Sequence, residues 1–154
     1  MTLIQSKAAK GIIPLAYPTI AGAVVAQRFT HTFSSAPSAN DILELAPLPA
    51  NTKIIDLILD SDDLDSNGAP TITFDVGIMS GNWGDEDNAR TCDDVFFDGA
   101  TVGQAGGVVR PTAKTAFRQA AGPTDRSIGV KIATAAATFQ AGEVGLTVLY
   151  AAAG

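Results

Sequence analysis

The sequence has one cysteine, one histidine and few charged residues. Cys92 stands alone, which excludes an intrachain disulfide and any zinc site built from several cysteines. Charged residues make up 17% of the chain, below the roughly 25% of an average soluble domain. Long helices held by salt bridges are therefore not expected. Alanine, glycine, threonine and valine are abundant instead, and this mixture favours strands and tight turns.

The sequence also lacks a basic cluster and a long apolar run. Its ten basic residues are scattered among sixteen acidic ones, with a net charge of −6, so nucleic-acid binding is not expected. No run of about 20 apolar residues occurs, so neither a transmembrane helix nor a membrane partner is predicted. Lys7 and Lys10 precede an apolar stretch, as in a signal peptide. Pro14 and Pro18 interrupt that stretch, and we expect no cleaved signal.

A chain of 154 residues is long enough for one domain with a buried core. We predict a single β-sandwich domain over residues 21–154, preceded by an extended arm over residues 1–20. The two prolines exclude a regular helix or a central strand from this arm. Its apolar content indicates that it lies on something, because an unsupported terminus is usually polar. The sequence leaves open whether that support is its own domain or a neighbour.

Alternation of apolar and polar residues predicts strands along most of the chain. The clearest segments are residues 23–33, 41–46, 53–60, 71–79, 126–139 and 144–151. Residues 94–97 are expected to add a short strand or a helical turn, and residues 108–120 a strand or a short helix. The polar turn at residues 141–143 predicts a hairpin between the last two strands. No strand is followed by a convincing helix, so we predict an all-β fold, an antiparallel β-sandwich or jelly-roll of about seven or eight strands.

Residues 51–80 are the most patterned part of the chain. Ile55, Leu57 and Leu59 are expected on one apolar face of the first strand, and the second strand alternates cleanly. A tight hairpin between the two strands would set Asp60 opposite Asp75, and like charges directly opposite are unfavourable. We therefore predict a wider loop, or a crossing between two sheets.

The connection within this stretch contains a possible calcium-binding sequence. Asp63, Asp65, Asn67 and Gly68 match the first half of an EF-hand loop. The twelfth position, which should be a bidentate glutamate, is Phe74. The same residue types serve in any exposed turn. A structural turn is favoured, and calcium binding stays open.

Nothing in the sequence assembles a catalytic site. Carboxylates gather in the loop over residues 81–107 without a histidine nearby, which favours a solvated acidic loop over a hydrolase. They are Asp85, Glu86, Asp87, Asp93, Asp94 and Asp98. His31 shares a strand face with Phe29 and Phe33, which favours half-buried packing over ligand binding. Acidic neighbours disfavour a thiolate at Cys92. We predict no enzyme activity, no metal ligand and no cofactor.

Two stretches resemble a known family. Residues 48–77, LPANTKIIDLILDSDDLDSNGAPTITFDVG, are similar to a recurrent signature of the small structural proteins of tailed bacteriophages. Residues 123–131, PTDRSIGVK, and the later Gly145-Leu-Thr-Val are similar as well. The chain thus resembles capsid cement or decoration proteins of the Bbp16-like kind. The arm and the loop over residues 83–107 carry no matching signature.

This resemblance implies a jelly-roll or β-sandwich protein that is made in the host cytoplasm and sits on the outer surface of the mature capsid. There it would form a homodimer or homotrimer and clamp neighbouring subunits of the major capsid protein, without catalytic residues. We expect the contacts to come from the arm and the long loop. The predicted contact residues are Ile12, Ile13, Leu15, Tyr17, Trp83, Phe96 and Phe97. The alternatives are a calcium-dependent ligand- or carbohydrate-binding β-sandwich and a hydrolase using the acidic loop.

Overall fold

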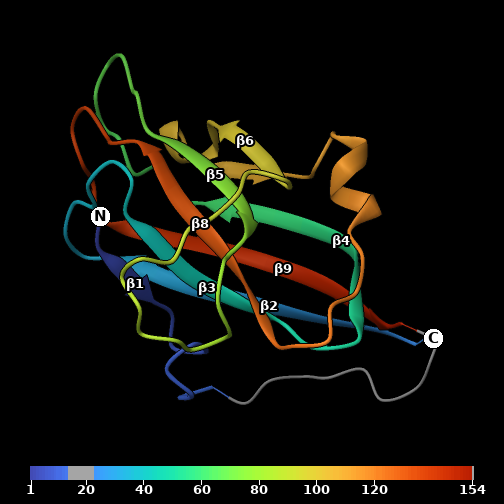
Figure 1. Cartoon of the computed structure of the whole chain (residues 1–154). Coiled ribbons are helices and arrows are strands. Elements are labelled where there is room, and N and C mark those ends of the chain that lie inside the picture. Colours follow the sequence, from blue (N-terminus) through green and yellow to red (C-terminus); the bar gives the residue numbers. More distant parts are fainter. Residues whose placement is uncertain (14–22, 154) are drawn as a thin grey trace.

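The computed structural model describes residues 1–13 and 23–153 as two β-sheets packed face to face (Figure 1). One sheet contains, in spatial order, β1 (Leu3–Gln5), β3 (Ile42–Leu48), β8 (Arg126–Thr134), β5 (Thr73–Ile78) and β6 (Phe97–Ala100). The other contains β2 (Val24–Phe33), β9 (Gly142–Ala152), β4 (Thr52–Ser61) and β7 (Gly107–Val109). Two 3₁₀-helices are η1 (Val102–Gln104) and η2 (Lys114–Arg118). In the described part of the chain, no helix is long and apolar enough to cross a membrane.

Strands β2 to β9 follow the path of a jelly roll. The spatial orders β2-β9-β4-β7 and β3-β8-β5-β6 place successive strands in opposite sheets, except for the neighbouring pair β5 and β6. Every pairing is antiparallel except that of β1, which runs parallel to β3. The predicted all-β sandwich or jelly-roll is confirmed, with nine strands in the described residues.

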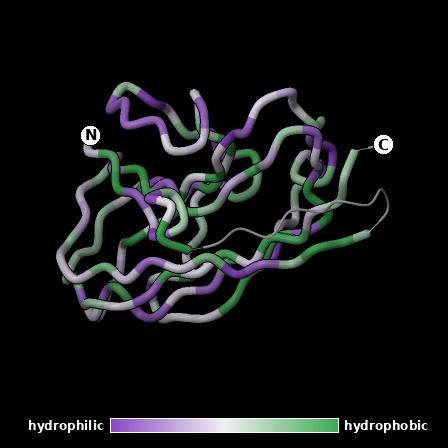
Figure 2. The backbone as a smooth tube through the Cα atoms, turned by 90° about the horizontal axis from the view of Figure 1, so that it is seen from below, coloured by the Kyte–Doolittle hydropathy of each residue, from purple (hydrophilic) through white to green (hydrophobic). Residues whose placement is uncertain are grey.

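The core lies between the sheets, and a β-bulge in β4 decides which side chains enter it. The pairing of β4 with β9 shifts register between Ile54 and Asp56, so Ile55 is the extra residue. Ile54 and Leu57 are both buried, whereas Ile55 is 39% exposed. The prediction that Ile55 shares the buried face of Leu57 and Leu59 is therefore wrong. Figure 2 shows how hydrophobic and hydrophilic residues are interspersed along the whole path of the chain.

The stretch over residues 51–80 crosses from one sheet to the other. Strand β4 pairs with β9 and β7, whereas β5 pairs with β8 and β6, so the absence of a tight hairpin is confirmed and, of the two predicted alternatives, the crossing occurs. Asp60 lies opposite Gly145, and Asp75 lies opposite Lys131. The two aspartates therefore never face each other, and Asp75 forms an ion pair with Lys131 at 3.3 Å.

The predicted hairpin at residues 141–143 is wrong, because β8 and β9 lie in different sheets. Strand β8 also ends at Thr134 and not at Phe139. After Thr134 the chain leaves the sheet to cover the connection between β4 and β5. There the N–H of Gln140 donates to the carbonyl oxygen of Leu64 at 3.0 Å. Alternation alone could not reveal this exit, because residues 135–139 still read as strand.

The long loop after β5 contains short elements of its own. The strand expected near residues 94–97 is β6, which begins at Phe97, and the N–H of Phe96 already donates to Val76 at 2.9 Å. Residues 108–120 hold the end of β7 and the 3₁₀-helix η2, so both expected types of element occur there. These elements bring residues 93–118 together at one corner of the sandwich (Figure 1).

Candidate functional site

Both oxygens of the Asp65 carboxylate accept hydrogen bonds from backbone N–H groups. Its side chain accepts hydrogen bonds from the N–H groups of Thr71 at 2.7 Å, Ile72 at 3.2 Å, Ala137 at 2.9 Å and Thr138 at 2.8 Å. Burial by itself raises the pKa of Asp65, but these donors outweigh it and hold the pKa well below its usual value. The charge of Asp65 is thus used to fasten two loops together.

This arrangement favours the structural turn over the calcium site. A calcium ion needs several oxygens directed at one point, and both carboxylate oxygens of Asp65 already point at N–H groups. A carboxylate oxygen of Asp63 accepts the N–H of Asp65 at 2.9 Å. Within residues 1–13 and 23–153, no group of three or more Asp, Glu, His or Cys side chains is placed to hold a metal ion.

A second polar network lies inside the protein around Glu44, which is fully buried. Oε1 of Glu44 pairs with Nη1 of Arg90 at 2.8 Å and accepts the hydroxyl of Ser127 at 2.5 Å. The other oxygen, Oε2, accepts the side-chain amide of Gln5 at 2.8 Å. Arg90 also donates to the carbonyl oxygen of Ser80 at 2.7 Å. One buried carboxylate therefore holds strand β1, strand β8 and the acidic loop together.

Three aspartates of the acidic loop are held by hydrogen bonds from nearby backbone N–H groups. Asp85 accepts the N–H of Asn82, Asp87 accepts that of Ala89, and Asp93 accepts that of Ile78. Each of these aspartates stabilises its own local turn or an adjoining strand. These three carboxylates are therefore engaged in local hydrogen bonds and do not supply the hydrolase alternative with a free pair of carboxyl groups.

His31 and Cys92 have packing roles. The ring of His31 is half-buried and lies edge-on to that of Phe33, with 4.8 Å between centroids, as predicted. Burial lowers the pKa of His31, with Lys10 adding to the effect. Burial also raises the pKa of the Cys92 thiol to about 12, so the expectation of a disfavoured thiolate is confirmed.

The predicted contact residues fall into different environments. Ile12 and Ile13 are 65% and 39% exposed, whereas Leu15 and Tyr17 lie outside the described residues. Trp83 is partly buried against the core. Phe96 and Phe97 are both buried, and Phe97 begins β6, where it pairs with Val76 of β5. Contact with another protein through any of these seven residues stays a prediction.

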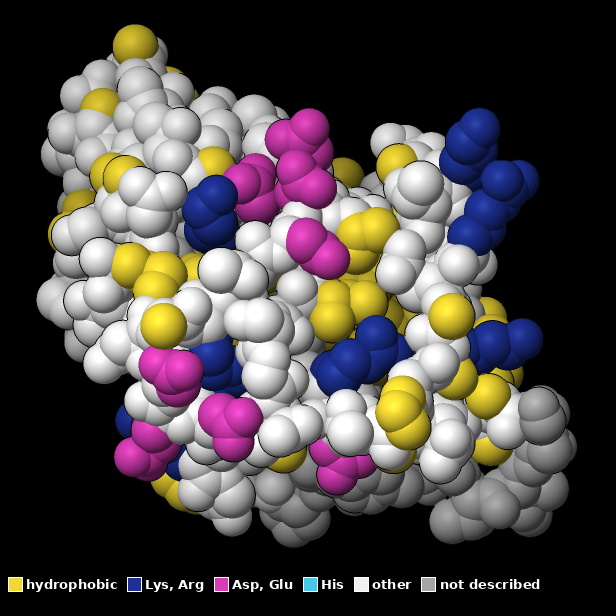
Figure 3. All heavy atoms as spheres, in the orientation of Figure 1, with side chains coloured by type: hydrophobic (Ala, Val, Ile, Leu, Met, Phe, Trp, Pro, Cys, Tyr) yellow, Lys and Arg dark blue, Asp and Glu magenta, His cyan; other side chains and the backbone are white. Residues whose placement is uncertain are grey.

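Sequence reasoning missed a groove of about 850 Å³ beside β6 and η2. It is lined by residues 93–102 and by most of residues 108–115. Figure 3 shows a hollow with hydrophobic side chains at its base, Asp and Glu side chains on one side and Lys and Arg on the other. The sequence carries one trace of this groove, which is a change from acidic to basic residues between the two segments that line it. Residues 85–98 contain six acidic residues and one arginine, whereas residues 99–124 contain three basic residues and no acidic one.

The described residues thus form a jelly-roll domain with exposed apolar side chains and a groove between segments of opposite charge. A chain in the solved capsid of Ralstonia phage GP4 is 52% identical, with a TM-score of 0.94 over 97% of both chains. A chain in the capsid asymmetric unit of cyanophage Pam1 is 26% identical, with a TM-score of 0.69 over 92% of this chain and 94% of that one. No family model and no curated protein sequence matches. The chain therefore belongs to the same family as the Ralstonia phage GP4 capsid chain and is a phage virion structural protein.

Proposed function

We propose that this protein is a cement protein of the Bbp16-like kind, which binds the outer surface of the mature phage capsid and bridges neighbouring subunits of the major capsid protein. The main support for this proposal is the 52% identity, over 97% of both chains, to a chain of a solved phage capsid. The signature-like stretch over residues 48–77 supports the same function. The protein acts by binding, as a homo-oligomer, without catalysis, metal or cofactor.

Cementing works by mass action on the shell. A protein that binds the assembled lattice, but not separate capsid subunits, stabilises the lattice. Each copy needs modest contacts, because copies that bridge several subunits bind with higher avidity. The net charge of −6 keeps the protein away from nucleic acid and so suits the outer surface.

The arm is positioned to supply one contact with the shell. Its first residues are anchored on the sandwich, because β1 pairs with β3 and the Ser6 hydroxyl donates to the carbonyl oxygen of Leu45 at 2.8 Å. Ala8 is also buried. Beyond this anchor, Ile12 and Ile13 expose apolar side chains to solvent. The arm thus combines an anchored first part with exposed apolar side chains beyond it, which suits contact with a neighbouring subunit.

Electron microscopy of purified heads with and without the protein tests this function. Heads lacking the protein should gain density on their outer surface when it is added, at positions that bridge capsid subunits. They should also release their genome at a higher temperature than unsupplemented heads. Density on the inner surface, or none at all, would contradict the proposal.

A further inference from the structure

We propose that the groove beside β6 and η2 is a self-association site, and that its occupant is the η2 segment of a second copy of this chain. The inference deepens the proposed function, because it rests on the cement protein acting as an oligomer. Three features carry it: an apolar base, unpaired acids on one wall, and an apolar knob between cations on the adjoining segment.

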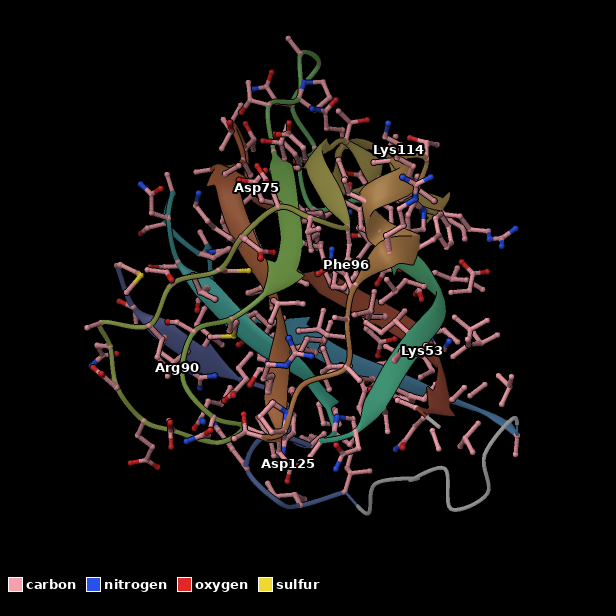
Figure 4. All side chains as sticks on the ribbon, turned by 45° about the vertical axis from the view of Figure 1, so that its right-hand side comes forward. Lys53, Asp75, Arg90, Phe96, Lys114 and Asp125 are labelled. Atoms are coloured by element: carbon pink, nitrogen blue, oxygen red, sulfur yellow. The ribbon has the colours of Figure 1, made fainter. Side chains whose placement is uncertain are left out.

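The base of the groove is apolar and firmly built. Phe96 is 2% exposed and joins the main core, while Val95, Val102 and Val109 pack partly buried around it. Figure 4 shows Phe96 between the strands, with Lys114 on η2 above it. The base can therefore receive an apolar side chain without first having to form.

The acidic side of the groove carries two carboxylates that have no partner among the described residues. Asp94 and Asp98 are exposed, and their side chains make no hydrogen bond or ion pair with any described residue. Asp93, by contrast, is held by the N–H groups of Ile78 and Val95. Two acids thus stay available to a cationic partner at the edge of an apolar surface.

Segment η2 carries the complementary features. Phe117 is 47% exposed, although it is a large hydrophobic residue. In a 3₁₀-helix residues three apart share a face, so Lys114 lies beside Phe117, with Arg118 adjacent. Neither cation forms an ion pair within the described residues. Buried Ala116 anchors the segment to the domain.

The two surfaces match in chemistry, but they cannot meet within one chain. Ala113 and Thr115, at the start of η2, already form a wall of the groove, so η2 cannot also enter it. A second copy can place Phe117 on the apolar base, with Lys114 and Arg118 against the two acids. Groove and η2 lie side by side on one surface, so a two-fold pair or a closed ring of copies can use this contact.

Sedimentation of the full-length chain at several protein concentrations tests the proposal. The wild-type protein should associate reversibly. The pair Lys114→Glu/Arg118→Glu and the pair Asp94→Lys/Asp98→Lys should each weaken association about tenfold or more, since like charges then face each other. An equimolar mixture of the two variants should associate again, because each variant then complements the other.

Matched controls separate the site from general effects. Glu86→Lys changes an exposed acid outside the groove and should leave association unchanged. Phe117→Ser should weaken it, whereas Val24→Ser, at another exposed apolar residue, should not. Circular dichroism should show that all variants remain folded.

A wild-type chain that stays monomeric, reversal variants that associate like wild type, or a mixture that fails to associate would each overturn the inference. Association and capsid binding are measured separately. A monomer that still binds heads refutes the self-association site alone. An oligomer that does not bind heads refutes the cement function alone.

Discussion

Asp65 and Thr138 are hydrogen-bonded at 2.8 Å although they lie 73 residues apart. The contact joins the connection between β4 and β5 to the connection between β8 and β9. Both connections cross between the sheets at the same end of the sandwich. Asp65, which the sequence suggests as a possible calcium ligand, therefore links the two connections that cross between the sheets.

Replacing Asp65 should destabilise the fold. Asp65→Ala removes the acceptor of the N–H groups of Thr71, Ala137, Thr138 and the buried Ile72, and a buried donor without a partner is unfavourable. Asp65→Asn keeps the shape but turns an NH₂ group towards other donors. Both variants should unfold at clearly lower urea concentrations than wild type. Glu86→Gln, at an exposed residue, should behave as wild type.

The contribution of Asp65 should depend on pH in a defined direction. Its pKa is lowered in the folded state, so the stabilisation is complete above the unfolded-state pKa of about 3.9. As the pH falls below that value, the unfolded chain takes up a proton that the folded chain does not, and the stabilisation declines. The stability difference between wild type and Asp65→Asn should shrink from neutral pH to strongly acidic pH. A difference that grows on acidification would contradict this account.

Breaking the buried pair of Glu44 and Arg90 should be costly. Arg90→Met leaves the Glu44 carboxylate buried without its counter-charge, so we expect a loss of about 3–5 kcal/mol in unfolding free energy. Urea unfolding measures it, and Lys53→Met, at an exposed residue, is the matched control. The double variant Glu44→Leu/Arg90→Met should lose less than Arg90→Met, because no buried charge remains. If both variants lost the same unfolding free energy, the uncompensated charge of Glu44 would not be the cause of the loss.

Removing the exposed apolar side chains of the arm should weaken binding to the shell. Ile12→Ser/Ile13→Ser should reduce affinity for heads about tenfold or more, without changing the melting temperature. Binding of labelled protein to heads, followed by sedimentation, measures it. Val24→Ser controls for the loss of an exposed apolar side chain elsewhere. Unchanged head binding after deletion of residues 1–18 would refute the arm contact.

The Cys92 thiol should react slowly in the native protein. Its pKa of about 12 leaves little thiolate at neutral pH, whereas an ordinary cysteine has a pKa of about 8.5. Alkylation by iodoacetamide, followed by mass spectrometry, should be roughly a thousandfold slower in the folded protein than in urea. Equal rates in both states would place the thiol in solvent.

The sequence predicted the fold class well because alternation and turn residues are local signals. The absence of a tight hairpin within residues 51–80 was also predictable, since such a hairpin would have opposed Asp60 and Asp75, but the sequence did not decide between a wider loop and a crossing. Ile55 was misplaced because a bulge depends on the partner strand β9, which lies far along the chain. The hairpin at residues 141–143 failed for a similar reason. Residues 135–139 leave the sheet and hydrogen-bond to Asp65, a contact that no local pattern reveals.

The candidate surfaces were less predictable than the fold. Phe96 and Phe97 looked like loop aromatics, but both are buried, and Phe97 pairs with Val76 of β5. The groove needs two segments of opposite charge to be folded against each other. Its trace in the sequence is the charge boundary between residues 85–98 and 99–124. This change in charge indicates a groove only once the fold places the two segments at the same corner.

The position of β9 has a consequence for how the protein is made. Strand β9 lies between β2 and β4 and pairs with both along most of their lengths. The four-stranded sheet therefore cannot form until Gly142–Ala152 has been synthesised. Strand β2, more than a hundred residues earlier in the sequence, has to wait for this partner during translation. Chains cut short before residue 142 lack the strand that joins β2 to β4, so premature termination should yield chains that cannot complete the sandwich.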